Sequence, residues 1–291
     1  MKKYNINKAI ILCGGMATRF LPLSKSIPKE MLPLYDKPIL EHIVEQLVSA
    51  NITDILIVLG RNKEYIPRHF TKNVELYDRL SKTHHCDMLD ICESIDIPTI
   101  KYIYQDEPLG TGHALELCES YIGTNPFLLL FGDEVLIPKS KSIIEELIDT
   151  YSIYGKPCIA TSECDMADVH KFGIIRGEHI SSNHILVREI VEKPTTQNAP
   201  SNICYIGASL LDRSIFEHLQ KLTSPLEQPL TDSLNVLAKM SKLIAVKYSG
   251  TRYDMGNPLS YFKANIDYIL NFSNNREDMI DYLNHTLSNI R

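Results

Sequence analysis

The sequence lacks several patterns that define common classes of protein. No apolar run approaches the roughly 18 residues that a membrane-spanning helix needs. The segment before the first apolar run contains no stretch resembling a secretory signal. Basic residues are not in surplus, since the net charge is −6, whereas nucleic-acid-binding domains usually present a basic surface. These absences predict a cytoplasmic chain that binds neither nucleic acid nor a membrane.

The cysteines lack the spacing that disulfide frameworks and zinc motifs use. There are 7 of them, an odd number, and no two form a C-x-x-C pair. His84, His85, Cys86 and Cys92 gather in one stretch, but without paired spacing they do not make a zinc motif. We therefore expect buried, reduced thiols.

Near the N-terminus, a short apolar run at 9–12 stops at Gly14 and Gly15. The loop that follows carries three cations, Arg19, Lys25 and Lys29. No acidic residue interrupts this loop before Glu30. Glycines let backbone N–H groups approach an anion, and clustered cations neutralise a polyphosphate. Because open α/β sheets bind ligands at the carboxyl ends of their strands, the pattern predicts a nucleoside triphosphate site.

The loop matches neither the P-loop motif nor the G-x-G-x-x-G dinucleotide motif, and a charged surface loop is the alternative for these residues alone. Four neighbouring motifs decide between the two: Gly15-Met-Ala-Thr-Arg-Phe-Leu-Pro22, Ser24-Lys25, Pro28-Lys-Glu-Met-Leu-Pro-Leu34 and Asp36-Lys-Pro38. With this spacing the chain resembles the bacterial UTP–glucose-1-phosphate uridylyltransferases, from about residue 8 to 271 and more thinly across 71–97. The resemblance implies transfer of a uridylyl group from UTP to glucose 1-phosphate, giving UDP-glucose and pyrophosphate. It also implies Mg²⁺ and a homo-oligomer, either a dimer or a tetramer.

The apolar segments predict an α/β fold with a Rossmann-like, doubly wound mixed sheet and helices on both faces, which the resemblance identifies as the nucleotidyltransferase fold. We expect strands at 9–13, 54–60, 99–104, 127–131, 157–161, 172–176, 185–192 and 201–211. We expect helices at 39–48, 111–120, 140–154 and from 257 onward. One domain should span 1–291, with a nucleotide half to about 135, a sugar half over 136–256, and C-terminal helices over 257–291.

Two segments of the chain are harder to assign. Residues 71–97 are polar, unpatterned and rich in charge, so we expect an excursion over the surface. The last helix carries an apolar stripe of Met279, Ile280, Leu283, Leu287 and Ile290. We expect this stripe to dock on its own subunit, and a dimer contact is the alternative.

Two aspartates are candidate Mg²⁺ ligands. Asp133 follows the apolar run at 127–131, at the sheet edge that carries the glycine loop, and Mg²⁺ prefers one or two carboxylates together with phosphate oxygens. Glu134 points the opposite way and is a weaker candidate, and Asp133 alone is also compatible with a turn residue or a helix N-cap. In the resembled family an aspartate in D-x-G-N shares the metal, and Asp254 stands in that motif.

The resemblance assigns further residues to the two substrates. Gln105 and Gly110 match elements that contact the base, Glu30 lies near the same nucleotide, and a primary amide can pair with the edge of uracil. Arg19 and Lys29 would balance charge on the triphosphate as pyrophosphate leaves. Gly173, Glu192 and Lys193 match elements that hold the hexose phosphate, where a carboxylate accepts from hydroxyls and an ammonium meets the phosphate. Without the resemblance, Gln105 and the Glu192-Lys193 pair are ordinary solvated residues.

The chain also departs from the family. Ala17 stands where glycine is usual, the strand before Asp133 ends in Phe-Gly rather than Pro, and Ser209 replaces a frequent tyrosine near the sugar. A thymidylyltransferase shares most of these motifs, but its relatives tend to have Gln where this chain has Glu30. A weakly active, nucleotide-binding regulatory paralogue is the other alternative, and the retained Arg19 and both aspartates argue against it.

Overall fold

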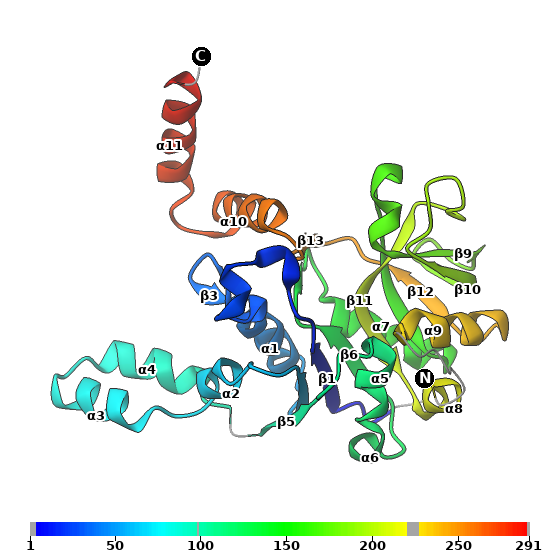
Figure 1. The fold of residues 1–291 in the computed structure, drawn as a ribbon, viewed down its shortest axis with the longest axis horizontal. Helices are drawn as coiled ribbons and strands as arrows, with labels where there is room; N and C mark the ends of the chain where they lie inside the picture. Colours follow the sequence, from blue (N-terminus) through cyan, green and yellow to red (C-terminus); the bar gives the residue numbers. More distant parts are fainter. Residues whose placement is uncertain (1–3, 98, 220–226, 290–291) are drawn as a thin grey trace.

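The computed structural model of the protein describes residues 4–97, 99–219 and 227–289, and within them nine strands form one mixed sheet (Figure 1). In chain order these strands are β1 (Lys8–Cys13), β4 (Asp54–Leu59), β5 (Ile100–Tyr104), β6 (Phe127–Phe131), β8 (Cys158–Glu163), β9 (Gly173–His179), β10 (His184–Glu192), β11 (Ile203–Leu211) and β12 (Ile244–Lys247). Across the sheet the order is β5-β4-β1-β6-β11-β8-β12-β10-β9. The predicted mixed α/β fold is confirmed.

Strands β5, β4, β1 and β6 run parallel and form the first half of the sheet. Every residue of β1 after Lys8 is buried, as expected for a parallel strand that is covered on both faces. Ala9 and Ile11 belong to one apolar core, and Ile10 and Leu12 belong to another. Because these four strands run in the same direction, their carboxyl ends lie along one edge of the sheet.

The second half of the sheet is mixed, as predicted. Strand β11 is antiparallel to both β6 and β8, β12 is parallel to β8, and β10 and β9 complete the edge in antiparallel pairing. Two small ribbons lie outside the main sheet: β7 (Glu134–Ile137) with β13 (Thr251–Asp254), and β2 (Pro33–Leu34) with β3 (Lys37–Pro38).

Helices cover both faces of the sheet: α1 (Ile39–Ser49), α5 (Thr111–Glu116), α6 (Glu119–Ile122), α7 (Ile143–Tyr154), α8 (Phe216–Leu219) and α9 (Leu230–Lys239). The apolar face predicted for α1 is buried, except for Val48, which is exposed. The single helix expected at 111–120 is wrong, because α5 and α6 are separate short helices. Helix α7 begins after Ser142, whose Oγ accepts from the Glu145 N–H at 3.2 Å in a capping box.

The segment over 71–97 crosses the surface as expected, and most of it is helical. It follows α2 (Tyr65–His69) and contains α3 (Val74–Lys82) and α4 (Cys86–Ile95), which pack on each other and extend away from the sheet (Figure 1). Helix α3 starts at Asn73, whose side chain accepts from the Leu76 N–H at 3.2 Å. Tyr77 is the buried residue of α3, and the helix packs on α4.

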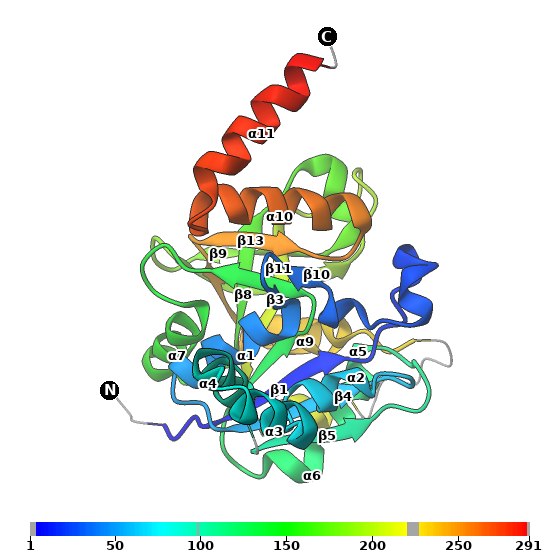
Figure 2. The same cartoon turned by 90° about the vertical axis from the view of Figure 1, so that its left-hand side faces the viewer.

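The chain ends with α10 (Pro258–Phe272) and α11 (Arg276–Asn289). Helix α11 contacts α10 and projects away from the body of the molecule (Figure 2), and none of its residues is buried. The expected docking of its apolar stripe on the same subunit is therefore wrong for the described residues, and Ile290 lies outside them. No described helix is long and apolar enough to cross a membrane.

All seven cysteines lie within the described residues, and all are free thiols. Cys13, Cys118, Cys158 and Cys204 are buried as expected, whereas Cys86 is exposed. Burial raises the pKa of Cys118 to about 12, so that thiol stays protonated at neutral pH. The described residues contain no group of three or more His, Cys, Asp or Glu side chains that could hold a metal ion.

Candidate active site

Two adjoining hollows open at the carboxyl edge of the parallel strands. The wide hollow, of about 900 Å³, is lined by eight residues that the sequence predicted: Gly15, Arg19, Lys29, Asp133, Gly173, Glu192, Lys193 and Asp254. The loop hollow, of about 520 Å³, lies between residues 14–29, 60–63 and 105–108, and Gly14 and Gln105 line it. Gly15, Ala17, Thr18 and Lys29 border both hollows. Of the predicted site residues, Glu30 and Gly110 are not part of either lining.

The glycine loop approaches other backbone and side chains closely. A Cβ on Gly14 would lie 2.5 Å from Oε1 of Gln105, so a larger residue there would have to displace that amide. Ala17 has φ of 51°, a left-handed conformation that favours glycine. The departure noted at Ala17 therefore places a methyl group on a strained backbone position, at a cost of about 1–2 kcal/mol.

Gln105 is buried and held in place by its neighbours. Its Nε2 donates to the Gly110 carbonyl at 3.0 Å and lies 3.0 Å from Nδ1 of His113. Gly110 has φ of 97°, and a Cβ there would lie 2.6 Å from the Gln228 carbonyl oxygen. The Gly110 carbonyl therefore holds the Gln105 amide in place, and Gly110 itself is the residue just before α5.

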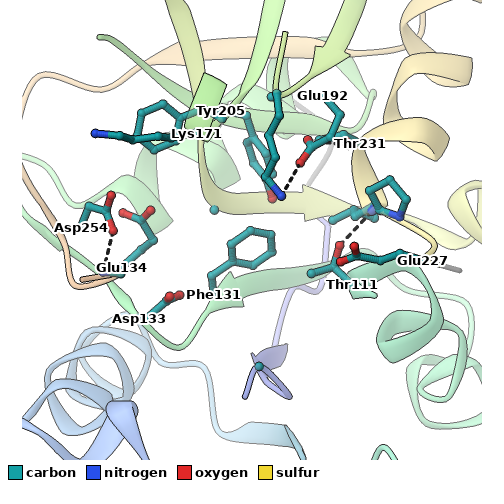
Figure 3. Close-up of a pocket in the computed structure, with 18 of the residues that line it drawn as sticks. Thr111, Phe131, Asp133, Glu134, Lys171, Glu192, Tyr205, Glu227, Thr231 and Asp254 are labelled. Atoms are coloured by element: carbon teal, nitrogen blue, oxygen red, sulfur yellow. Dashed lines mark hydrogen bonds and ion pairs between the residues drawn. The ribbon is translucent and has the colours of Figure 1, made fainter. Parts of the chain in front are cut away.

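The two predicted metal ligands come together at one end of the wide hollow (Figure 3). Asp133 follows Gly132, whose N–H donates to the Leu12 carbonyl at 3.0 Å, and Asp254 ends β13. The Met255 N–H donates to the Asp133 carbonyl at 3.2 Å, which ties the two aspartates together. The Asp254 carboxylate accepts from the Gly256 N–H at 2.7 Å. Sequence spacing alone does not show this convergence, because the aspartates come from distant parts of the chain.

Charged side chains surround Asp133. Lys29 donates to its carboxylate, and burial acts to lower the pKa of Lys29, but the charges of Asp133 and Glu30 outweigh burial and raise it. Glu30 is buried and pairs with Lys63 at 2.7 Å. Lys63 lines the loop hollow and was missed by sequence reasoning, since a single lysine after a strand carries no motif. Arg19 lies beside Asp254, with Nη1 3.8 Å from the Cβ position of Gly256.

Glu192 and Lys193 also line the wide hollow. Oε2 of Glu192 accepts from Oγ1 of Thr231 at 2.9 Å, and Oε1 lies 3.2 Å from Nζ of Lys193 (Figure 3). A Cβ on Gly173 would lie 2.8 Å from the Thr231 methyl group, so glycine leaves room for this arrangement. Thr231 is a further site residue that sequence reasoning missed.

Ser209 does not line either hollow. It is buried, and its hydroxyl hydrogen-bonds the Tyr205 hydroxyl at 2.8 Å. Tyr205 lines the wide hollow instead, so a phenol borders the site from four residues earlier on β11. Strand β11 has a register irregularity between these two residues, which re-aims the side chains.

Residues 8–270 match the nucleotidyl transferase family, and the chain belongs to that family. UTP–glucose-1-phosphate uridylyltransferase YngB of Bacillus subtilis is 37% identical over 96% of this chain and 94% of its own length. The UTP-bound UGPase from Acinetobacter baumannii has a TM-score of 0.87 at 30% identity, covering 96% of this chain and 98% of that one. A UDP-glucose pyrophosphorylase complexed with UDP-glucose has a TM-score of 0.80 at 32% identity, covering 90% and 98%. The resemblance read from the motifs is confirmed.

Proposed function

We propose that this chain transfers a uridylyl group from UTP to glucose 1-phosphate, giving UDP-glucose and pyrophosphate. The observation that supports it most is that a single hollow is lined by Arg19 and Lys29, by the two aspartates, and by Glu192 with Lys193. Two anionic substrates can meet in this hollow. The similar proteins named above are uridylyltransferases or bind UTP or UDP-glucose, which supports the same reaction.

The reaction needs no protein nucleophile. A phosphate oxygen of glucose 1-phosphate attacks the α-phosphorus of UTP, and the bond from that phosphorus to the bridging oxygen breaks as pyrophosphate leaves. Arg19 and Lys29 balance the charge that develops on pyrophosphate, while Lys193 holds the attacking phosphate in line. Gln105 and Gly110 bind on the base side, Glu30 lies near the nucleotide, and Gly173 and Glu192 bind on the hexose side.

The aspartate pair fits a divalent cation, which we propose is Mg²⁺. Asp133 and Asp254 offer two carboxylates in the wide hollow, and no described group of three or more metal-binding side chains competes with them. Mg²⁺ is usually bound by one or two carboxylates, with substrate phosphates and water completing its octahedron. Bound there, the cation would neutralise phosphate charge. Lys29 already contacts Asp133, so the same cluster can orient both the lysine and the carboxylate toward phosphate.

Measuring pyrophosphate release tests the proposal. Purified protein would receive UTP or dTTP, each with glucose, galactose or mannose 1-phosphate, at saturating Mg²⁺. We expect the highest kcat/KM with UTP and glucose 1-phosphate. A preference for dTTP would identify a thymidylyltransferase, and binding of UTP without release from any pair would identify a regulatory paralogue.

We also propose that the chain forms a homo-oligomer in which a second copy covers α10 and α11. These helices expose several large apolar side chains: Leu259, Phe262, Ile266, Phe272, Ile280, Tyr282 and Leu287. A helix of 14 residues that projects from the body is only marginally stable in water unless another surface packs on it. Light scattering coupled to size-exclusion chromatography should give at least a dimer mass, and a monomer at micromolar concentration would contradict this proposal.

A further inference from the structure

Glu134, which lines the wide hollow and has no role assigned toward either substrate, forms an ion pair with Arg252. Arg252 donates from Nε to Oε2 of Glu134 at 2.8 Å and from Nη2 to Oε1 at 2.6 Å, a two-pronged arrangement. The side chains are 14% and 13% exposed, so water screens the pair little. A pair of this geometry is both directional and strong.

The pair holds together the two strands that carry the aspartates. Glu134 follows Asp133 directly, and Arg252 stands two residues before Asp254 on β13. Glu134 is paired in register with Asp254, so their side chains share one face of the ribbon, and two like charges there repel. Arg252 neutralises Glu134 and thereby leaves the negative charge of this corner to the two aspartates.

Arg252 also reaches the hexose-phosphate side. Its guanidinium lies 4.5 Å from the centre of the Phe172 ring, a stacking contact. The Phe172 carbonyl accepts from the Lys193 N–H at 2.9 Å, and Phe172 precedes Gly173. Lys193 has φ of 44°, a left-handed conformation that needs support from its surroundings. A continuous set of contacts therefore runs from the aspartate corner through Arg252 and Phe172 to Lys193.

We propose that Arg252 is a positioning residue that fixes the hexose-phosphate loop at Phe172 and Lys193 relative to Asp133 and Asp254. This inference rests on the proposed function of the wide hollow and adds a residue that acts through others. Arg252 does not line that hollow, whereas Glu134 does. Lysine cannot replace it, because an ammonium lacks both the planar fork and the stacking face.

The test compares Arg252→Lys with a matched control on the outer strands. Arg188 makes the same two-pronged contact with Glu178, at 3.1 and 3.0 Å, but that pair is exposed and far along the sheet edge. Titration calorimetry without metal would measure UDP-glucose and UTP binding to wild type, Arg252→Lys and Arg188→Lys. We expect Arg252→Lys to weaken UDP-glucose about tenfold and UTP less than about twofold, since UTP lacks the hexose. Arg188→Lys should change neither affinity.

A second variant separates positioning from folding. Glu134→Met with Arg252→Met replaces the pair by apolar side chains of similar length, a change that is often neutral for stability. We expect this double variant to keep the thermal midpoint within a few degrees and still to bind UDP-glucose about tenfold more weakly. Equal affinities of wild type and Arg252→Lys for UDP-glucose would overturn the inference, as would equal weakening of both ligands. Failure of wild type to bind UDP-glucose at all would instead reject the proposed function.

Discussion

Replacing Asp133 by asparagine should damage both turnover and stability, whereas the same change at Asp254 should damage turnover alone. The difference arises from Lys29, whose ammonium contacts the Asp133 carboxylate. The Lys29 side chain is 15% exposed and the Asp133 side chain is 23% exposed. Removing one partner of a buried ion pair costs about 3–5 kcal/mol, and partial exposure here reduces that to about 2–3 kcal/mol. For a chain of this size, such a loss lowers Tm by roughly 4–8 °C. Asp254 has a backbone partner, the Gly256 N–H at 2.7 Å, which an asparagine oxygen can keep.

The pH dependence of this difference follows from Lys29. Burial acts to lower its pKa, and the charges of Asp133 and Glu30 outweigh burial and raise it. A raised lysine pKa means that the pair contributes fully below the unfolded value of 10.5 and is lost only as pH rises through the higher folded value. The gap in Tm between wild type and Asp133→Asn should therefore stay constant from about pH 7 to 9.

Pyrophosphate release at saturating Mg²⁺ and calorimetric unfolding would measure both effects. We expect each single variant to lose at least about 100-fold in kcat, because an amide is a poor ligand for Mg²⁺. Adding Lys29→Met to Asp133→Asn should recover much of the stability, since no buried charge is then left unpaired, but none of the turnover. Near-normal rates in both single variants would refute the metal assignment. Equal Tm for Asp133→Asn and Asp254→Asn would refute the role given to Lys29.

Three further predictions concern other parts of the site. Arg19→Ala should lower kcat more than it raises KM for UTP, because charge on pyrophosphate develops only in the transition state, and a pure KM effect would reassign Arg19 to ground-state binding. Glu192→Gln should weaken discrimination between glucose 1-phosphate and its epimers, whereas Lys193→Ala should impair every sugar phosphate alike; unchanged kcat/KM ratios in Glu192→Gln would remove that residue from sugar choice. Gly207→Ala should cost about 1–2 kcal/mol in urea unfolding, because φ is 69° and the new Cβ would lie 2.9 Å from the Phe131 ring, and an unchanged midpoint would contradict this strain.

The parts of the fold that the sequence predicts well are those fixed by local patterns. The run at 9–13 is apolar without interruption because both faces of β1 are covered, and the face of α1 follows helical spacing. The motifs also predict eight of the residues that line the wide hollow. These patterns involve residues close together in the sequence, so they can be recognised before the fold is known.

The features that were missed depend on contacts between distant segments. The Arg252–Glu134 pair joins residues 118 positions apart, and neither side chain belongs to a short motif of its own. Thr231 supports Glu192 from α9, a helix that was not predicted from the sequence. Helix α3 was missed for a different reason, because Val74, Tyr77 and Leu80 recur at helical spacing and Asn73 caps the helix, but the segment is otherwise polar. Contacts between distant segments leave little local signal in the sequence, and a single capping residue leaves only a weak one.

Strand β11 has a consequence for exchanging parts between enzymes of this family. It lies after residue 136 in the chain, yet it inserts beside β6, with Ala208 opposite Leu130 and Leu211 opposite Phe127. Replacing the chain from about residue 136 onward would therefore exchange β11 and keep β6, so the paired strands would come from two different proteins. A replacement segment of this length has to pair with β6 in the same way as β11 does. That pairing includes the irregularity at Gly207, which packs on Phe131. Substitutions confined to residues 171–173, 192–193 and 227–232 leave the pairing of β6 with β11 unchanged and still alter the lining of the wide hollow.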